Sequence, residues 1–164
     1  MTGKTHAICG TAVMALITVK FPESLVLFEQ DYTPAIGLAT AAIGSYMPDI
    51  DMVQSKLGSK HKIIASLLTH RGITHTLFIP AILVLLMYYA SLNGLPVIPE
   101  LILGLNIGWV AHILADMFNK KGVPLLWPVY LGKIHIASLV TGTWHEAPFI
   151  LIWMGGIVAC WTLL

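Results

Sequence analysis

Long stretches without Asp, Glu, Lys or Arg alternate with short polar segments along the chain. Trimmed of turn residues, these stretches predict about five helices, at 6–20, 33–47, 75–91, 100–118 and 147–164. The breaks agree with these limits, because Pro48 ends the second stretch, Asn93-Gly94 follows the third and Lys120-Lys121-Gly122 ends the fourth. No internal repeat is visible, so we predict a single all-α domain over residues 1–164.

Composition indicates where these helices reside. Hydrophobic residues make up 57% of the chain and charged residues 10%, whereas a soluble domain carries about 25% charged residues. Any one helix could be the buried helix of a soluble protein, but five in 164 residues leave too little polar surface to cover them. We therefore predict an integral membrane helix bundle with four or five spans. The first two are short for a bilayer that needs about 20 apolar residues.

The cations predict how the bundle lies in the membrane. With five spans, the N-terminus and residues 48–74 and 119–146 share one side, and the C-terminus lies on the other. Lys20 falls on the second side, and the other eight cations fall on the first: Lys4, Lys56, Lys60, Lys62, Arg71, Lys120, Lys121 and Lys133. The positive-inside rule makes that side cytoplasmic. A net charge of +1 without a basic stripe predicts no nucleic-acid binding.

The same alternation gathers histidines and aspartates at the cytoplasmic end. Imidazole and carboxylate groups are the usual ligands of catalytic zinc and related divalent ions. Ionisable groups beside lipid are costly, so several together indicate function. We predict a metal site at this end, and its candidate ligands are His6, Asp49, Asp51, His70, His75, His112 and Asp116.

Local spacing supports two pairs within this set. His112 and Asp116 are four residues apart, which places them on one helix face; the alternative is a structural histidine–carboxylate hydrogen bond. Asp49 and Asp51 are two residues apart, and in an extended segment they would point the same way and repel unless a cation lay between them. Their alternative is a solvated turn in which one aspartate is a cap.

The segment before the third predicted helix offers further chemistry. His70 and His75 flank Gly72, which permits a tight backbone, and Thr74 or Thr76 could cap the helix or orient a ligand. Arg71 is the only arginine in the chain. It could bind a phosphate bidentately or extend to the membrane interface.

Glu146 begins the last predicted helix on the same side. It could be a general base or a metal ligand. The alternative is an acidic residue that complements the helix dipole.

These motifs together resemble the YdjM family of bacterial inner-membrane proteins. The resemblance rests on Pro48-Asp49-Ile50-Asp51, His70-Arg71-Gly72-Ile73-Thr74-His75-Thr76, His112-Ile113-Leu114-Ala115-Asp116 and Gly122-Val123-Pro124-Leu125-Leu126-Trp127-Pro128. The family is described as metal-dependent hydrolases. It is named in part for LexA (SOS-response) regulation of a member, and is grouped distantly with zinc-dependent phospholipase C and P1 nuclease, all-α enzymes with a multinuclear zinc site.

The resemblance implies an inner-membrane location and a site for two or three divalent ions, zinc first and manganese second. Matched residue by residue, His6 is the early family histidine and His70 the histidine of the HRG segment. Glu146 is similar to an acidic residue near the last family span. The central ligands match Asp49, Asp51, His75, His112 and Asp116.

Residues and resemblance together predict a membrane-bound metal-dependent hydrolase, a phosphoesterase acting on a phospholipid or another phosphoester at the cytoplasmic interface. Arg71 would hold a phosphate oxygen, and Asp116 or Glu146 would manage the proton of water. One rival is a metal-ion or proton transporter, which would need polar residues continuing across the membrane; the first and third stretches almost lack them. Another is a non-catalytic membrane protein of the damage response in which metal only staples short helices.

Overall fold

The computed structural model describes residues 1–21, 34–52, 55, 58–61, 63, 71–95 and 97–163. Within these residues the chain is helical and has no strand, which confirms the all-α prediction. Two short 3₁₀ turns, η1 (Pro48–Asp51) and η2 (Ile73–His75), lie between the second and third α-helices. The α-helices are α1 (Gly3–Lys20), α3 (Pro34–Gly44), α5 (Phe78–Leu92), α6 (Val97–Asp116) and α7 (Glu146–Leu163).

Side-chain caps and turn residues set the helix limits. Thr2 caps α1 by accepting a hydrogen bond from the Thr5 N–H at 3.4 Å. Thr76 accepts a hydrogen bond from the Phe78 N–H at 3.2 Å just before α5, whereas the N-cap position itself is Leu77 and has no side-chain cap. After α5 the chain turns at Gly94, whose φ of 63° suits a residue without a Cβ.

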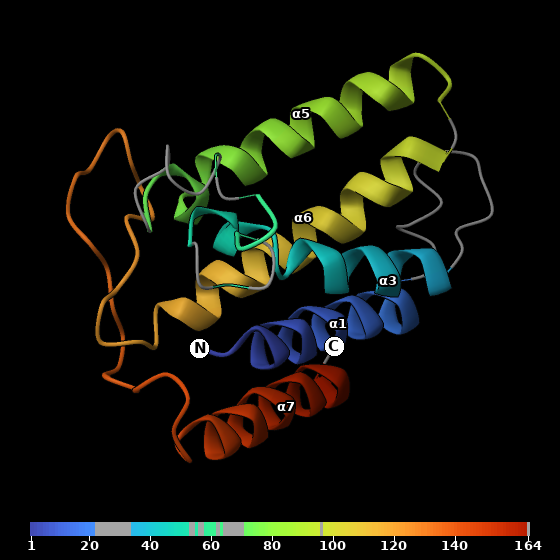
Figure 1. The fold of residues 1–164 in the computed structure, drawn as a ribbon. Coiled ribbons are helices and arrows are strands. Elements are labelled where there is room, and N and C mark those ends of the chain that lie inside the picture. The colour runs from blue at the N-terminus through green and yellow to red at the C-terminus, as the bar shows by residue number, and fades with distance from the viewer. Residues whose placement is uncertain are drawn as a thin grey trace.

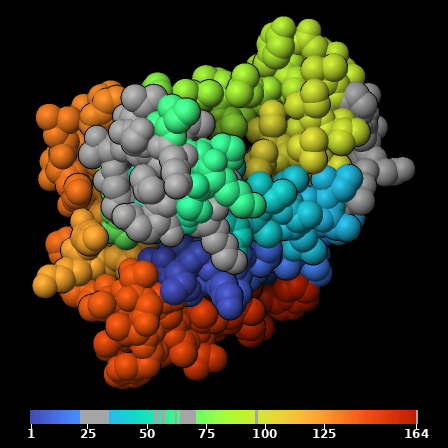
Figure 2. Space-filling view, viewed as in Figure 1, coloured from blue at the N-terminus to red at the C-terminus, as the bar shows by residue number. Residues whose placement is uncertain are grey.

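Helix α6 is the centre of the bundle and packs against α1, α3 and α5 (Figure 1). Helix α7 packs mainly on α1, and in the space-filling view the N-terminal segment lies between α7 and α3 (Figure 2). Successive helices run in opposite directions (Figure 1). The starts of α1, α5 and α7 and the ends of α3 and α6 therefore lie at the same end of the bundle as the N-terminus. The turns η1 and η2 also contact each other there.

Glycines allow the closest helix contacts. A Cβ at Gly44 of α3 would overlap the backbone of Leu105 in α6, and one at Gly108 of α6 would overlap the backbone of Ala41 in α3. Small residues at a helix contact let two backbones approach, which is a common mode of packing between membrane helices. The α3–α6 contact therefore depends on these two positions.

We expect Gly108→Ala to lower the free energy of unfolding by about 1–3 kcal/mol, because the added methyl group must push apart two backbones that contact each other. Gly156→Ala is the matched control. It also lies in a helix, but a Cβ there meets no atom within 4 Å, and alanine favours helix. Thermal unfolding of the purified proteins in detergent compares them; equal melting temperatures for Gly108→Ala and the unaltered chain would contradict the packing argument.

Two helices have the length and apolar composition of a membrane span, namely α6 and α7. Helix α5 is apolar but has 15 residues, and α3 has 11, which corresponds to about 16 Å of rise. Helix α1 has 18 residues but begins with Lys4 and His6 and ends with Lys20. The described structure thus has fewer candidate spans than the four or five expected from the apolar stretches, because several of those stretches end in turns rather than helix.

Candidate metal centre

Four turns or helices bring the predicted ligands together at the N-terminal end of the bundle. His6 comes from the first turn of α1, and the two aspartates of η1 lie beside His75 of η2. His112 and Asp116, in the last turn and a half of α6, complete the set. Buried members with at most 3% exposure are His6, Asp51, His75, His112 and Asp116. His70 lies outside the described residues.

The orientation of the His112 ring is fixed by the backbone. Its Nδ1 lies 2.7 Å from the carbonyl oxygen of Ser45 at the end of α3. A carbonyl can only accept, so Nδ1 carries the proton and a neutral ring then has its lone pair at Nε2. The buried Nε2 atom has no hydrogen-bond partner among the described residues. Metal-binding histidines are commonly oriented in this way by a carbonyl on the other ring nitrogen.

Asp49 faces this nitrogen without a proton donor between them. Asp49 Oδ1 is 3.7 Å from His112 Nε2 and 4.0 Å from His75 Nε2. These distances are too long for hydrogen bonds, but ligands of one ion with bonds of about 2.0–2.2 Å are separated by roughly 3–4 Å. Burial raises the pKa of Asp49, and the nearby His6 and His75 partly offset that effect. A divalent ion fits this donor set, because it would stabilise the buried carboxylate.

Asp116 lies between His6 and His75. Its Oδ1 is 3.3 Å from His6 Nε2, and its Oδ2 is 3.7 Å from His75 Nε2. The Asn119 amide donates to Oδ1 at 2.5 Å, and the Met1 nitrogen lies 3.0 Å from the same oxygen. A carboxylate with one oxygen toward each histidine could bridge two ions.

The ligand atoms form two overlapping groups. One contains Asp49, His75 and His112, and the other contains His6, His112 and Asp116; the atoms of each group lie within 4.8 Å of one another. The His6 and His112 rings are stacked with centroids 3.7 Å apart. His112 Nε2 has one lone pair and can bind one ion at a time. If two ions are bound, the second must therefore rely on His6 and Asp116.

The aspartates of η1 point to different partners. Asp51 Oδ2 accepts hydrogen bonds from the Arg71 N–H at 2.9 Å and the Thr74 hydroxyl at 2.6 Å, and it lies 3.3 Å from His75 Nδ1. The expected extended segment is wrong, because Pro48–Asp51 forms a 3₁₀ turn, in which residues two apart point about 120° away from each other. Asp49 thus faces the ring nitrogens, while Asp51 contacts the opposite nitrogen of His75.

Arg71 is buried at the cluster instead of extending to the membrane interface. Its exposed fraction is 7%, Nη1 donates to the Gly122 carbonyl at 3.0 Å and Nη2 lies 2.5 Å from Asp116 Oδ2. The buried Nε has no acceptor among the described residues. The backbone φ of 55° is unusual for a residue with a side chain and indicates local strain. Such strain is common where a side chain is held for function.

Glu146 takes part in a different contact. Its carboxylate accepts from the Thr2 N–H, the Thr2 and Thr5 hydroxyls and the Gly142 N–H. These bonds join the start of α7 to the start of α1, as expected for an acidic residue in the first turn of a helix. This geometry favours the structural alternative for Glu146 over a role as ligand or base.

Two contacts were not foreseen from the sequence. Asn119 lies three residues after Asp116, just beyond the end of α6, and this closeness in sequence to a candidate ligand offered a signal. The Ser45 carbonyl offered none, because every residue has a carbonyl and only the fold brings this one to His112.

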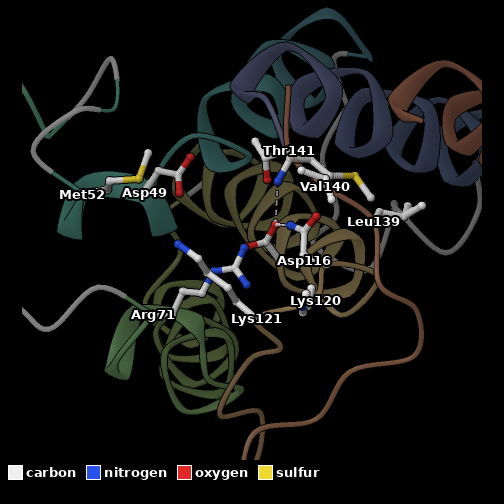
Figure 3. A pocket seen from close by; sticks show the side chains of 11 residues that line it. Asp49, Met52, Arg71, Asp116, Lys120, Lys121, Leu139, Val140 and Thr141 are labelled. Carbon is white, nitrogen blue, oxygen red and sulfur yellow. Dashed lines mark hydrogen bonds and ion pairs between the residues drawn. The ribbon is translucent and has the colours of Figure 1, made fainter. Parts of the chain in front are cut away.

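A pocket of about 350 Å³ opens onto the cluster (Figure 3). Asp49, Arg71 and Asp116 form part of its wall, so a molecule in the pocket reaches the candidate ligands directly. The rest of the lining comes from Met1, from Met52, from the residues just after α6 and from the segment around residue 140. Glu146 does not line this pocket.

Known proteins similar to this chain are membrane proteins or lack an assigned activity. The profile of the YdjM inner membrane protein family matches residues 1–163. The uncharacterized protein YvsG of Bacillus subtilis is 30% identical over 150 residues, which cover 89% of this chain and 85% of YvsG. Inner membrane protein YdjM of Escherichia coli is 38% identical over 93 residues, or 54% of this chain and about half (47%) of that protein. No solved structure matches the chain.

Proposed function

The chain belongs to the YdjM inner membrane protein family, and we propose that it is a membrane-bound metal-dependent hydrolase that cleaves a phosphoester at the cytoplasmic interface. The observation that carries this proposal is the pair formed by the buried His112 Nε2 and Asp49 Oδ1, two acceptors 3.7 Å apart. A cation between them would satisfy both. The pocket beside them gives a substrate access to that position.

Two sets of residues would hold divalent ions, zinc or manganese. Asp49, His75 and His112 would hold the first, and His6 would hold a second with Asp116 as the bridging carboxylate. When bound, such ions lower the pKa of water and neutralise charge on phosphoryl oxygens. Asp51 would then orient His75 from the opposite ring nitrogen, as the Ser45 carbonyl orients His112.

Arg71 and Asp116 are suited to the remaining steps. Arg71 Nε is a buried donor that lacks an acceptor among the described residues, and a phosphate oxygen would supply one. Of the acids considered as general base, Asp116 lines the pocket and Glu146 does not. Asp116 would therefore manage the proton of the attacking water only in a site where it is not itself bound to metal, whereas Glu146 joins the start of α7 to the start of α1.

Purified full-length protein tests the proposal. It is stripped with a chelator, reconstituted with Zn²⁺ or Mn²⁺ and assayed against phosphomonoesters, phosphodiesters and phospholipids in detergent. We expect hydrolysis of at least one class, lost on stripping and restored by metal. Metal-loaded, well-folded protein that cleaves none of these esters would contradict the proposal.

The apolar surface supports a multi-pass arrangement with the site on the cytoplasmic side. Leu151 and Ile152 of α7 and Leu85 of α5 are each more than 65% exposed, which suits contact with lipid. Helices α6 and α7 are joined at the site end of the bundle, and residues 117–145 between them carry Lys120, Lys121 and Lys133. Cations near span ends favour the cytoplasm.

A topology assay tests this orientation. We expect alkaline phosphatase fused after residue 164 to be active, because the C-terminus would be periplasmic, and the same enzyme inserted within residues 52–62 to be inactive. Green fluorescent protein at the same positions, which fluoresces in the cytoplasm, should give the opposite pattern. A reversed pattern would refute the orientation, and two fusions on one side would refute the span count.

A further inference from the structure

The pocket has more positive than negative side chains. Its charged lining consists of Asp49 and Asp116 against Arg71, Lys120 and Lys121. These side chains alone carry an excess of one positive charge. Met1, whose ammonium pairs with Asp116, also lines the pocket, and each divalent ion at the cluster would add two more positive charges. Lys120 and Lys121 are exposed, and the only acidic residues that share the pocket wall with them are the two candidate ligands.

Apolar side chains line the same pocket, and some of them lie next to these lysines. Met52, Leu139 and Val140 are among the lining residues. The Lys120 N–H donates to the Leu139 carbonyl at 3.3 Å, and the Leu139 N–H donates to the Phe118 carbonyl at 3.0 Å. These backbone bonds fix the segment around residue 139 to the end of α6. A ligand in the pocket therefore meets both cations and hydrocarbon.

Residues 117–145, which connect α6 to α7, expose large apolar side chains. Trp127 and Tyr130 are 38% and 53% exposed, and the neighbouring Val129 and Leu131 are 94% and 78% exposed. Aromatic and aliphatic residues beside lysines are typical of protein segments at the membrane–water interface. Leu139 and Val140 of the pocket lining belong to this same connection between α6 and α7.

We propose that the pocket takes a membrane lipid that ends in a phosphate monoester or a diphosphate. A terminal phosphate carries about −1.5 to −2 charge at neutral pH, which suits the excess of cations. A zwitterionic phosphodiester would bring an ammonium group toward Lys120 and Lys121, where like charges repel. The inference rests on the proposed function and names its substrate class.

The reaction adds water across one phosphorus–oxygen bond. The water oxygen bonds to the terminal phosphorus, and the bond from that phosphorus to the bridging oxygen breaks. The bridging oxygen receives a proton, so a monoester yields a lipid alcohol and inorganic phosphate. A diphosphate yields the lipid monophosphate and inorganic phosphate, and no oxidant or other co-reactant is needed.

Binding of inorganic phosphate, which has no bridging oxygen to cleave, tests the charge argument without turnover. We expect Lys120→Gln/Lys121→Gln to weaken phosphate binding by about 10-fold or more in calorimetry, since charge-assisted contacts are lost. Lys60→Gln/Lys133→Gln removes the same charge from exposed positions that do not line the pocket, and should change affinity by less than about 2-fold. Equal effects of the two double variants would overturn the assignment. Zinc content, measured on each protein, shows separately whether the metal centre is intact.

Turnover in mixed micelles distinguishes the sources of the phosphate. We expect phosphatidic acid to be hydrolysed with a higher kcat/KM than phosphatidylcholine and glycerol 3-phosphate. The double variant Lys120→Gln/Lys121→Gln should raise the KM for phosphatidic acid more than it lowers kcat. A preference for glycerol 3-phosphate would refute a lipid source, and a preference for phosphatidylcholine would refute the whole inference while leaving the proposed hydrolase intact. If metal-loaded protein cleaves none of the three, the proposed function fails as well.

Discussion

His112→Ala protein is expected to lose its tightly bound metal and its hydrolytic activity. Among the described residues, His112 is the one that belongs to both groups of candidate ligands, so its substitution removes an atom from both. Loss of a residue that only orients a ligand costs about 10- to 100-fold in metal affinity or activity. Loss of a ligand should exceed that range, and added metal should not restore turnover.

His61→Ala is the control for this substitution. His61 is exposed and lies in the segment after η1, away from the candidate ligands. We expect its metal content and turnover to equal those of the unaltered chain. A circular dichroism spectrum and a gel-filtration profile establish that His112→Ala protein is folded, since metal could also stabilise the bundle. Folded His112→Ala protein with full metal content would exclude His112 as a ligand.

Asp51→Asn is expected to weaken metal binding by about 10- to 100-fold without abolishing it. Asp51 contacts His75 at Nδ1, the nitrogen opposite to the one that faces Asp49 and Asp116. Asparagine retains the shape but removes the negative charge that holds the ring and accepts from Arg71 N–H and the Thr74 hydroxyl. Saturating zinc should therefore restore most of the lost turnover.

The pattern of rescue separates two roles for Asp51. If it orients His75, activity returns as zinc is titrated and kcat approaches that of the unaltered protein. If it is itself a ligand, as the sequence motifs predict, the variant behaves like His112→Ala and stays inactive at any zinc concentration. Turnover of Asp51→Asn equal to the unaltered chain at trace zinc would contradict both roles.

The apolar pattern was sufficient to predict the helices and the end of the bundle where the ligands meet. Helix α6 was expected at 100–118 and spans Val97–Asp116, and α7 was expected at 147–164 and spans Glu146–Leu163. Once consecutive helices alternate in direction, His6, His75 and His112 must fall at one end. This follows from connectivity and requires no knowledge of side-chain contacts.

The direction of individual side chains could not be predicted in the same way. Pro48–Asp51 is too short for a periodic pattern, and the choice between an extended segment and a 3₁₀ turn decides whether Asp49 and Asp51 face one ion or two partners. The role of Glu146 depends on Thr2 and Thr5, which are more than 140 residues away in sequence. Tertiary contacts of this kind are not encoded in local spacing.

Elemental analysis of the full-length chain, purified in detergent without chelator, is the measurement that tests the central claim most directly. The acceptor Asp49 Oδ1 and the buried acceptor His112 Nε2, 3.7 Å apart, predict at least one zinc or manganese ion per chain, retained through gel filtration and absent from folded His112→Ala protein. Folded, unaltered chain that carries no stoichiometric metal, and takes up none when dialysed against Zn²⁺ or Mn²⁺, would contradict the account.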